Sequence, residues 1–137
     1  MIFLLDTCVL SEATKPGKDK GVVAWLASQP LERHYVSAVT LGELHFGAER
    51  LPDGKRRQKL REWVKTVEED YAGRIVPLDQ AIAARWGALR AEYPNTPVVD
   101  GQIAATALTY GFALVTRNVK DFPVHEVHLI NPWRERY

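Results

Sequence analysis

The sequence is poor in residues that build disulfides, zinc sites or catalytic triads. It has a single cysteine, Cys8, which excludes an internal disulfide and fits a reducing compartment. Its four histidines share no spacing typical of a zinc site or a triad; they are His34, His45, His125 and His128. We therefore expect neither a zinc site nor nucleophilic catalysis by Cys8.

An excess of charge of either sign is also missing. The chain has 18 Lys and Arg against 17 Asp and Glu, so its formal net charge is +1. No overall basic field draws such a protein onto nucleic acid, and any contact with nucleic acid has to be local or carried by metal ions. The apolar start, residues 1–5, ends at Asp6 and is too short for a signal peptide or a membrane span. We expect a cytoplasmic protein without a membrane segment.

The pattern of apolar residues predicts the fold class. The 137 residues fit one domain, spanning 1–137, with an ordinary globular composition. Residues 2–5 are a continuous apolar run, typical of a central strand buried on both faces. Further strands are expected at residues 35–37, 74–78, 112–116 and 127–130. They alternate with helical patterns, which predicts an α/β fold whose central, mainly parallel sheet of four to five strands is flanked by helices.

Two helical segments lead to specific expectations. Thr40 is a candidate N-cap, with Glu43 three residues later as in a capping box. After the turn at 52–54, residues 55–71 show the longest helical pattern, and the two helices are expected to form an antiparallel hairpin. The second helix begins with the cations of Lys55–Arg61. We interpret this run as a solvated helix face, with a local contact to nucleic acid as the alternative.

The stretch Val98–Leu108 is the most informative part of the chain. It places Asp100 at the amino-terminal start of an apolar helix, which we expect to end at Gly111. In parallel sheets, ligands bind beyond the carboxyl ends of the strands. Asp6 and Asn118 follow predicted strands at that edge, while Glu43 and Asp100 lie near the starts of helices that face it.

Oxygen-bearing side chains are therefore expected to converge at one edge of the sheet. They are Asp6, Glu43, Asp100 and the pair Asn118 and Asp121. Two carboxylates about 4 Å apart cost about 4 kcal/mol at an effective dielectric of about 20, so such a cluster favours a bound cation. Hard divalent ions such as Mg²⁺ prefer oxygen ligands. Taken singly, these residues could instead cap helices or build a turn; their coincidence at one edge favours a metal site.

Four stretches together resemble the motifs of PIN-domain ribonucleases, most closely the VapC toxins of toxin–antitoxin pairs and their FitB-like branch. The stretches are Leu4–Glu12, Ser37–Leu44, Asp100–Ala107 and Val115–Phe122. The ending Asn131–Trp133 is similar to that branch as well. The resemblance covers essentially the whole chain, with the motifs in the expected order.

The chain departs from the family pattern at two positions. Cys8 stands where the family often has Asn or Ser, which affects one hydrogen bond near Asp6. Asn118 stands where the family often has Asp, with Asp121 three residues later. Because Asn is the weaker ligand, either Asn118 or Asp121 could be the fourth residue of the site.

The resemblance implies a metal-dependent endoribonuclease. Asp6, Glu43 and Asp100 would hold Mg²⁺ or Mn²⁺, directly or through water, and Asn118 or Asp121 would support the ion or the water at the rim. Glu43 could instead orient the attacking water, and Thr116 would add a supporting hydrogen bond. The chemistry implied is metal-assisted hydrolysis of RNA phosphodiester bonds.

The resemblance also implies partners. A cognate antitoxin would block the acidic cleft, the toxin would form homodimers and toxin–antitoxin hetero-oligomers, and promoter DNA would be contacted only through the antitoxin. The alternative left open is a catalytically weak or inactive module that binds a basic peptide in the same cleft.

Overall fold

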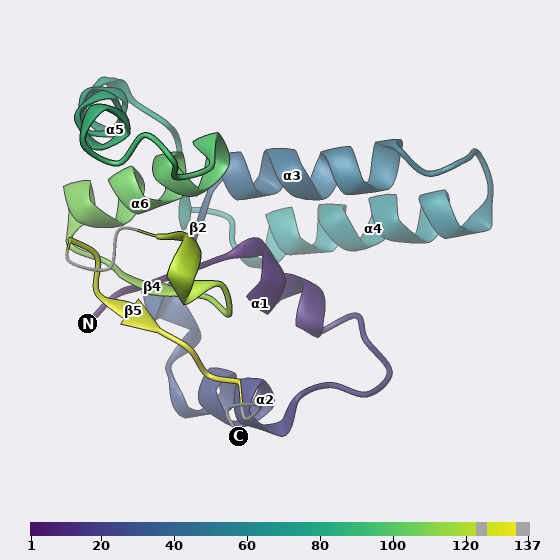
Figure 1. Cartoon of the computed structure of the whole chain (residues 1–137). Helices are drawn as coiled ribbons and strands as arrows, with labels where there is room; N and C mark the ends of the chain where they lie inside the picture. Colours follow the sequence, from purple (N-terminus) through teal and green to yellow (C-terminus); the bar gives the residue numbers. More distant parts are fainter. Residues whose placement is uncertain (123–125, 134–137) are drawn as a thin grey trace.

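Five parallel strands form the centre of the molecule. The computed structural model describes residues 1–122 and 126–133 (Figure 1). The strands are β1 (Phe3–Leu5), β2 (His34–Ser37), β3 (Ile75–Val76), β4 (Ala113–Val115) and β5 (Leu129–Ile130). Their order across the sheet is β3-β2-β1-β4-β5, and every neighbouring pair is parallel. The predicted parallel sheet with a central first strand is confirmed; the edge strands β3 and β5 are shorter than predicted.

Helices cover both faces of this sheet. They are α1 (Thr7–Glu12), α2 (Lys20–Ser28), α3 (Ala38–Glu49), α4 (Lys55–Asp70), α5 (Gln80–Glu92) and α6 (Val98–Tyr110), with the 3₁₀ turns η1 (Leu31–Arg33) and η2 (Val119–Asp121). Side chains of a strand point alternately to its two faces, so β1 contributes to two cores. Phe3 and Leu5 pack in a core with residues of α1, α2 and α4, while Leu4 packs with α5 and α6.

Helix α6 lies close to its neighbours because its buried side chains are small. Ala104, Ala105 and Ala107 are buried, and at Gly101 a β-carbon would come within 3.3 Å of the Trp86 ring of α5. The helix ends, as predicted, at Gly111, whose φ of 69° is the left-handed conformation that glycine adopts readily. This close packing holds the first turn of α6 at the edge of the sheet.

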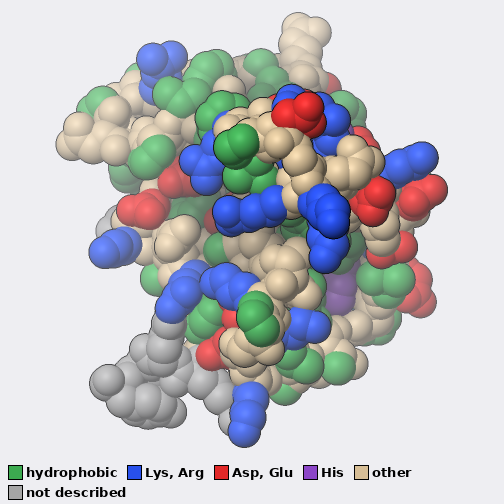
Figure 2. Space-filling model, turned by 90° about the vertical axis from the view of Figure 1, so that its right-hand side faces the viewer, with side chains coloured by type: hydrophobic (Ala, Val, Ile, Leu, Met, Phe, Trp, Pro, Cys, Tyr) green, Lys and Arg blue, Asp and Glu red, His purple; other side chains and the backbone are tan. Residues whose placement is uncertain are grey.

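Helices α3 and α4 form the predicted antiparallel hairpin, which projects from the sheet at its carboxyl edge (Figure 1). Lysine and arginine side chains gather on the side of the molecule from which the hairpin projects (Figure 2). Within the described residues, no helix has both the length and the apolar character needed to cross a membrane.

Candidate functional site

Asp6 is fixed at the point where β1 ends and α1 begins. Its side chain caps α1, because Oδ1 accepts a hydrogen bond from the Thr7 backbone N–H at 2.8 Å. Oδ2 accepts from the Thr116 hydroxyl at 2.8 Å and from the Cys8 thiol at 3.8 Å. Only 5% of the residue is exposed. Burial raises the pKa of Asp6, and the hydrogen bonds from Thr116, Thr7 and Cys8 partly oppose this rise.

Thr116 connects Asp6 to the loop after β4. The fully buried hydroxyl of Thr116 donates to Asp6 and accepts from the Asn118 backbone N–H at 3.1 Å. The Cys8 sulfur lies 3.6 Å from the same hydroxyl and accepts from the Arg117 N–H at 3.4 Å. Burial, with the charge of Asp6, raises the pKa of the Cys8 thiol. The protonated thiol therefore donates a weak hydrogen bond to Asp6 and is a poor nucleophile.

Glu43 reaches this site from α3 and does not belong to a capping box. The N-cap of α3 is Ser37, whose hydroxyl accepts from the Val39 N–H at 3.0 Å. The predicted cap at Thr40 is wrong, because Thr40 lies inside the helix, where its hydroxyl is buried and has no hydrogen-bond partner among the described residues. Glu43 instead accepts a hydrogen bond at 2.8 Å from the hydroxyl of Thr7, the residue after Asp6.

Asp100 lies in the first turn of α6 and is not its cap. The helix begins at Val98 after Pro97, so the alternative of Asp100 as an N-cap is wrong. The pKa of Asp100 is raised to about 6, first by burial and then by the negative charges of Asp6, Asp121 and Glu43. Those charges act on Asp100 because Asp6, Asp121 and Glu43 lie in its neighbourhood at the edge of the sheet.

The two candidates for a fourth residue differ in their surroundings. Asn118 is exposed, and its side chain makes no capping hydrogen bond to η2. Asp121, at the end of η2, is partly buried and close enough to raise the pKa of Asp100. The structure thus brings a fourth carboxylate to the cluster three residues after the position at which the family often has one.

The cluster suits a hydrated divalent cation better than a tightly caged ion. Among the residues that the structure describes, no three His, Cys, Asp or Glu side chains are close enough together to bind one ion directly. Mg²⁺, however, usually keeps several waters and takes only one or two carboxylates from the protein. The available donors are carboxylate oxygens, which fit Mg²⁺ or Mn²⁺ and do not fit a soft metal.

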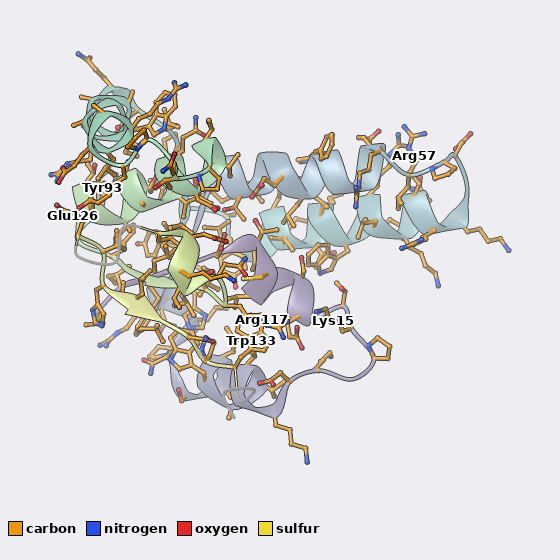
Figure 3. The ribbon with its side chains drawn as sticks, in the orientation of Figure 1. Lys15, Arg57, Tyr93, Arg117, Glu126 and Trp133 are labelled. Atoms are coloured by element: carbon orange, nitrogen blue, oxygen red, sulfur yellow. The ribbon has the colours of Figure 1, made fainter. Side chains whose placement is uncertain are left out.

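Sequence patterns missed two features of the site. The hydroxyl of Thr7 holds Glu43, and its only signal was its place directly after Asp6 in an Asp-Thr pair. Arg117, in the loop after β4, lies with its guanidinium 5.5 Å from the centre of the Trp133 ring (Figure 3). The ending Asn131–Trp133 therefore supports the loop that carries Asn118.

The corrected cap of α3 leads to a prediction about stability. Ser37→Ala should lower the free energy of unfolding by about 1 kcal/mol, because it removes the hydrogen bond to the Val39 N–H. Thr40→Val should leave it unchanged or raise it by up to about 1 kcal/mol, because the methyl group replaces a buried hydroxyl that forms no hydrogen bond within the described part of the chain. Urea denaturation of both variants checks the pair; the reverse order of stabilities would restore Thr40 as the cap.

Comparison with known protein families gives a match over most of the chain. The sequence model of the PIN domain family matches residues 3–124. The chain is 37% identical to VapC ribonuclease Y4jK of Sinorhizobium fredii, over 96% of this chain and 98% of that protein. It is 38% identical to Toxin FitB of Neisseria gonorrhoeae, over 98% of this chain and 100% of that protein.

Solved structures give the same result for the fold. The structure of FitAB bound to an IR36 DNA fragment superposes with a TM-score of 0.88 at 35% identity, covering 99% of each chain. A toxin–antitoxin complex from Klebsiella pneumoniae superposes with a TM-score of 0.74 at 26% identity, covering 95% of this chain and 97% of that one.

Proposed function

Because the chain belongs to the PIN domain family, and within it to the VapC and FitB toxins, we propose that it cleaves RNA as the toxin of a toxin–antitoxin pair. The observation that supports the catalytic site most strongly is the pKa of Asp100, raised to about 6 by burial and by the charges of Asp6, Asp121 and Glu43. A carboxylate whose pKa is raised by neighbouring negative charges is stabilised when a divalent cation lies beside it.

The residues of the site would have different roles in binding the ion. Asp6 and Asp100 would bind Mg²⁺ or Mn²⁺, directly or through water, and Glu43 would complete the site. When bound, the ion supplies Lewis acidity and an activated water for hydrolysis of the phosphodiester bond. Thr116 and the Thr7 N–H keep the Asp6 carboxylate in one orientation.

The rim of the site and the link between helices have supporting roles. The Thr7 hydroxyl binds Oε1 of Glu43, which leaves Oε2 for the ion or its water. Asp121 faces the cluster from η2, and Asn118 stands at the exposed end of the same loop. We assign the fourth, supporting role to Asp121 and keep Asn118 as a contact for water or RNA.

Partners follow from the same family. We propose that a cognate antitoxin covers the acidic cleft with a basic side chain, and that the toxin forms homodimers within a larger complex. The complex would contact promoter DNA through the antitoxin. Similarity to a toxin–antitoxin complex and to FitAB bound to DNA supports this assembly. A cytoplasmic location remains a prediction.

Metal-dependent cleavage is the test of this proposal. The purified chain, separated from any antitoxin, should degrade RNA in Mg²⁺ or Mn²⁺ and should lose this activity in EDTA, because the carboxylates alone lack an activated water. Calorimetry should show Mn²⁺ binding at millimolar ion or below. If the chain binds no Mn²⁺, leaves RNA intact and binds an Arg-rich peptide tightly, it is the non-catalytic module and the ribonuclease proposal is wrong.

A further inference from the structure

The structure divides the basic run at the start of α4 into two groups. Arg57 and Arg61 face α3 and share Glu49: Arg61 donates to both of its carboxylate oxygens at 2.7 and 2.6 Å, and Arg57 donates at 3.0 Å. The pKa of Glu49 is lowered to about 2 by these hydrogen bonds, first from Arg61 and then from Arg57. Figure 3 shows Arg57 beside the α3–α4 turn, away from Lys15. These two arginines therefore connect α4 to α3 through Glu49.

The second group lies on a different side of α4, near Thr14 of the segment between α1 and α2. Four residues of α4 recur at the spacing of one helical face, and together with Thr14 they line a hollow of about 530 Å³. We name this hollow the basic groove; its lining residues are Thr14, Arg56, Lys59, Leu60 and Trp63.

The cations of the basic groove are available to a ligand. Arg56 and Lys59 are exposed, and neither forms an ion pair with an acidic side chain in the described part of the chain. Trp63 is only partly buried against the core, and it also lines the hollow. Figure 2 shows Lys and Arg side chains across the middle of this side of the molecule.

We propose that the basic groove binds the backbone of single-stranded RNA on one side of the cleavage site. This inference rests on the proposed ribonuclease function. A groove that combines cations with an aromatic surface is typical of proteins that hold single-stranded nucleic acid, since phosphates pair with the cations and bases stack on the ring. A protein of net charge +1 has no general attraction for RNA, so such a local surface has to supply it.

The groove is also placed where a bound RNA strand would reach the site. Helix α1 follows directly after Asp6, and Thr14 lies two residues beyond its end at Glu12. Six helical residues rise about 9 Å, so α1 separates Asp6 from the Thr14 end of the groove by about this length. An RNA strand lying in the groove can therefore continue along α1 to the carboxylate cluster.

The test compares RNA binding by variants that cannot cleave. In an Asp100→Asn background, a fluorescein-labelled single-stranded RNA of mixed sequence is titrated at salt concentrations between about 50 and 200 mM. The double change Arg56→Ala and Lys59→Ala should raise Kd several-fold at the low end of this range. It should also reduce the slope of log K against log salt by about 1.4, or about 0.7 for each phosphate that the groove no longer binds.

Lys65→Ala is the matched control, because it removes one charge from the same helix. Lys65 is exposed and lies nine residues after Arg56, on the opposite side of α4, so its variant should bind RNA like the parent. Equal effects of Lys65→Ala and of the double change would overturn the proposal. So would a double variant that binds RNA normally but binds the antitoxin more weakly, since the groove would then be an antitoxin surface. RNA cleavage by the wild-type chain in Mg²⁺, measured in parallel, tests the ribonuclease function separately.

Discussion

Replacing Asp100 with asparagine is expected to abolish metal-dependent RNA cleavage and to make the metal-free protein more stable at neutral pH. The loss of activity follows from removing one of the carboxylates proposed to hold the ion. The gain in stability follows from the pKa of Asp100, which is raised from 3.8 to about 6 by burial and by the charges of Asp6, Asp121 and Glu43. A carboxyl group with a raised pKa destabilises the folded state once it is ionised.

The sign of this effect gives a pH profile. Because the folded protein holds the Asp100 proton more tightly than the unfolded chain does, the metal-free wild type should lose stability as the pH rises from about 4 to above 6. After allowance for solvent screening, the loss is on the order of 1–2 kcal/mol. Thermal unfolding in EDTA at several pH values should show this decline in the wild type and a smaller one in Asp100→Asn.

Two further variants test whether these effects are specific to the carboxylate cluster. Asp6→Asn should also abolish cleavage, whereas Asp53→Asn changes an exposed aspartate in the α3–α4 turn and should leave cleavage and the pH profile unchanged. Addition of Mg²⁺ should raise the melting temperature of the wild type at neutral pH and have little effect on Asp100→Asn. Cleavage at the wild-type rate by Asp100→Asn would rule out the carboxylate cluster as the catalytic site.

The second large effect is expected at Thr116, which we propose as a positioning residue for Asp6. Thr116→Val keeps the shape of the side chain but removes the donor that binds Asp6 at 2.8 Å and the acceptor that binds the Asn118 N–H at 3.1 Å. Removing a group that orients a metal-binding carboxylate typically costs about 10–100-fold in metal affinity or activity, and we expect a reduction in that range. The loss of this donor to a buried carboxylate should also destabilise the fold by about 1–3 kcal/mol.

Thr116→Ser is the matched control, because it keeps the hydroxyl and removes only a methyl group. It should retain most of the Mn²⁺ affinity measured by calorimetry, while Thr116→Val should not. If both variants bind Mn²⁺ like the wild type, Thr116 has only a structural role.

The sheet and the position of Asp6 could be predicted because short-range patterns determine them. An apolar run with no polar alternation has to be buried on both faces, and β1 lies at the centre of the sheet for that reason. A polar residue directly after such a strand falls at its carboxyl edge in any parallel sheet, as Asp6 does. The antiparallel hairpin of α3 and α4 followed equally from one short turn.

The partners of the site residues could not be predicted, because they depend on contacts between distant segments. Glu43 and Thr40 match a capping box in spacing, yet Ser37 already caps the helix before Thr40, so Glu43 is free to bind Thr7. The choice between Asn118 and Asp121 depends on how η2 approaches α6. The run of basic residues at the start of α4 likewise did not indicate, from its sequence, that Arg57 and Arg61 bind Glu49. It also did not indicate that their neighbours stay exposed.

The contact between Arg117 and Trp133 has a practical consequence for anyone who produces the protein. A tag fused after Tyr137 would begin only a few residues beyond the ring that supports the loop bearing Asn118. Met1, 62% exposed, stands at the amino edge of β1, across the sheet from the carboxylates. An affinity tag therefore belongs on the amino terminus.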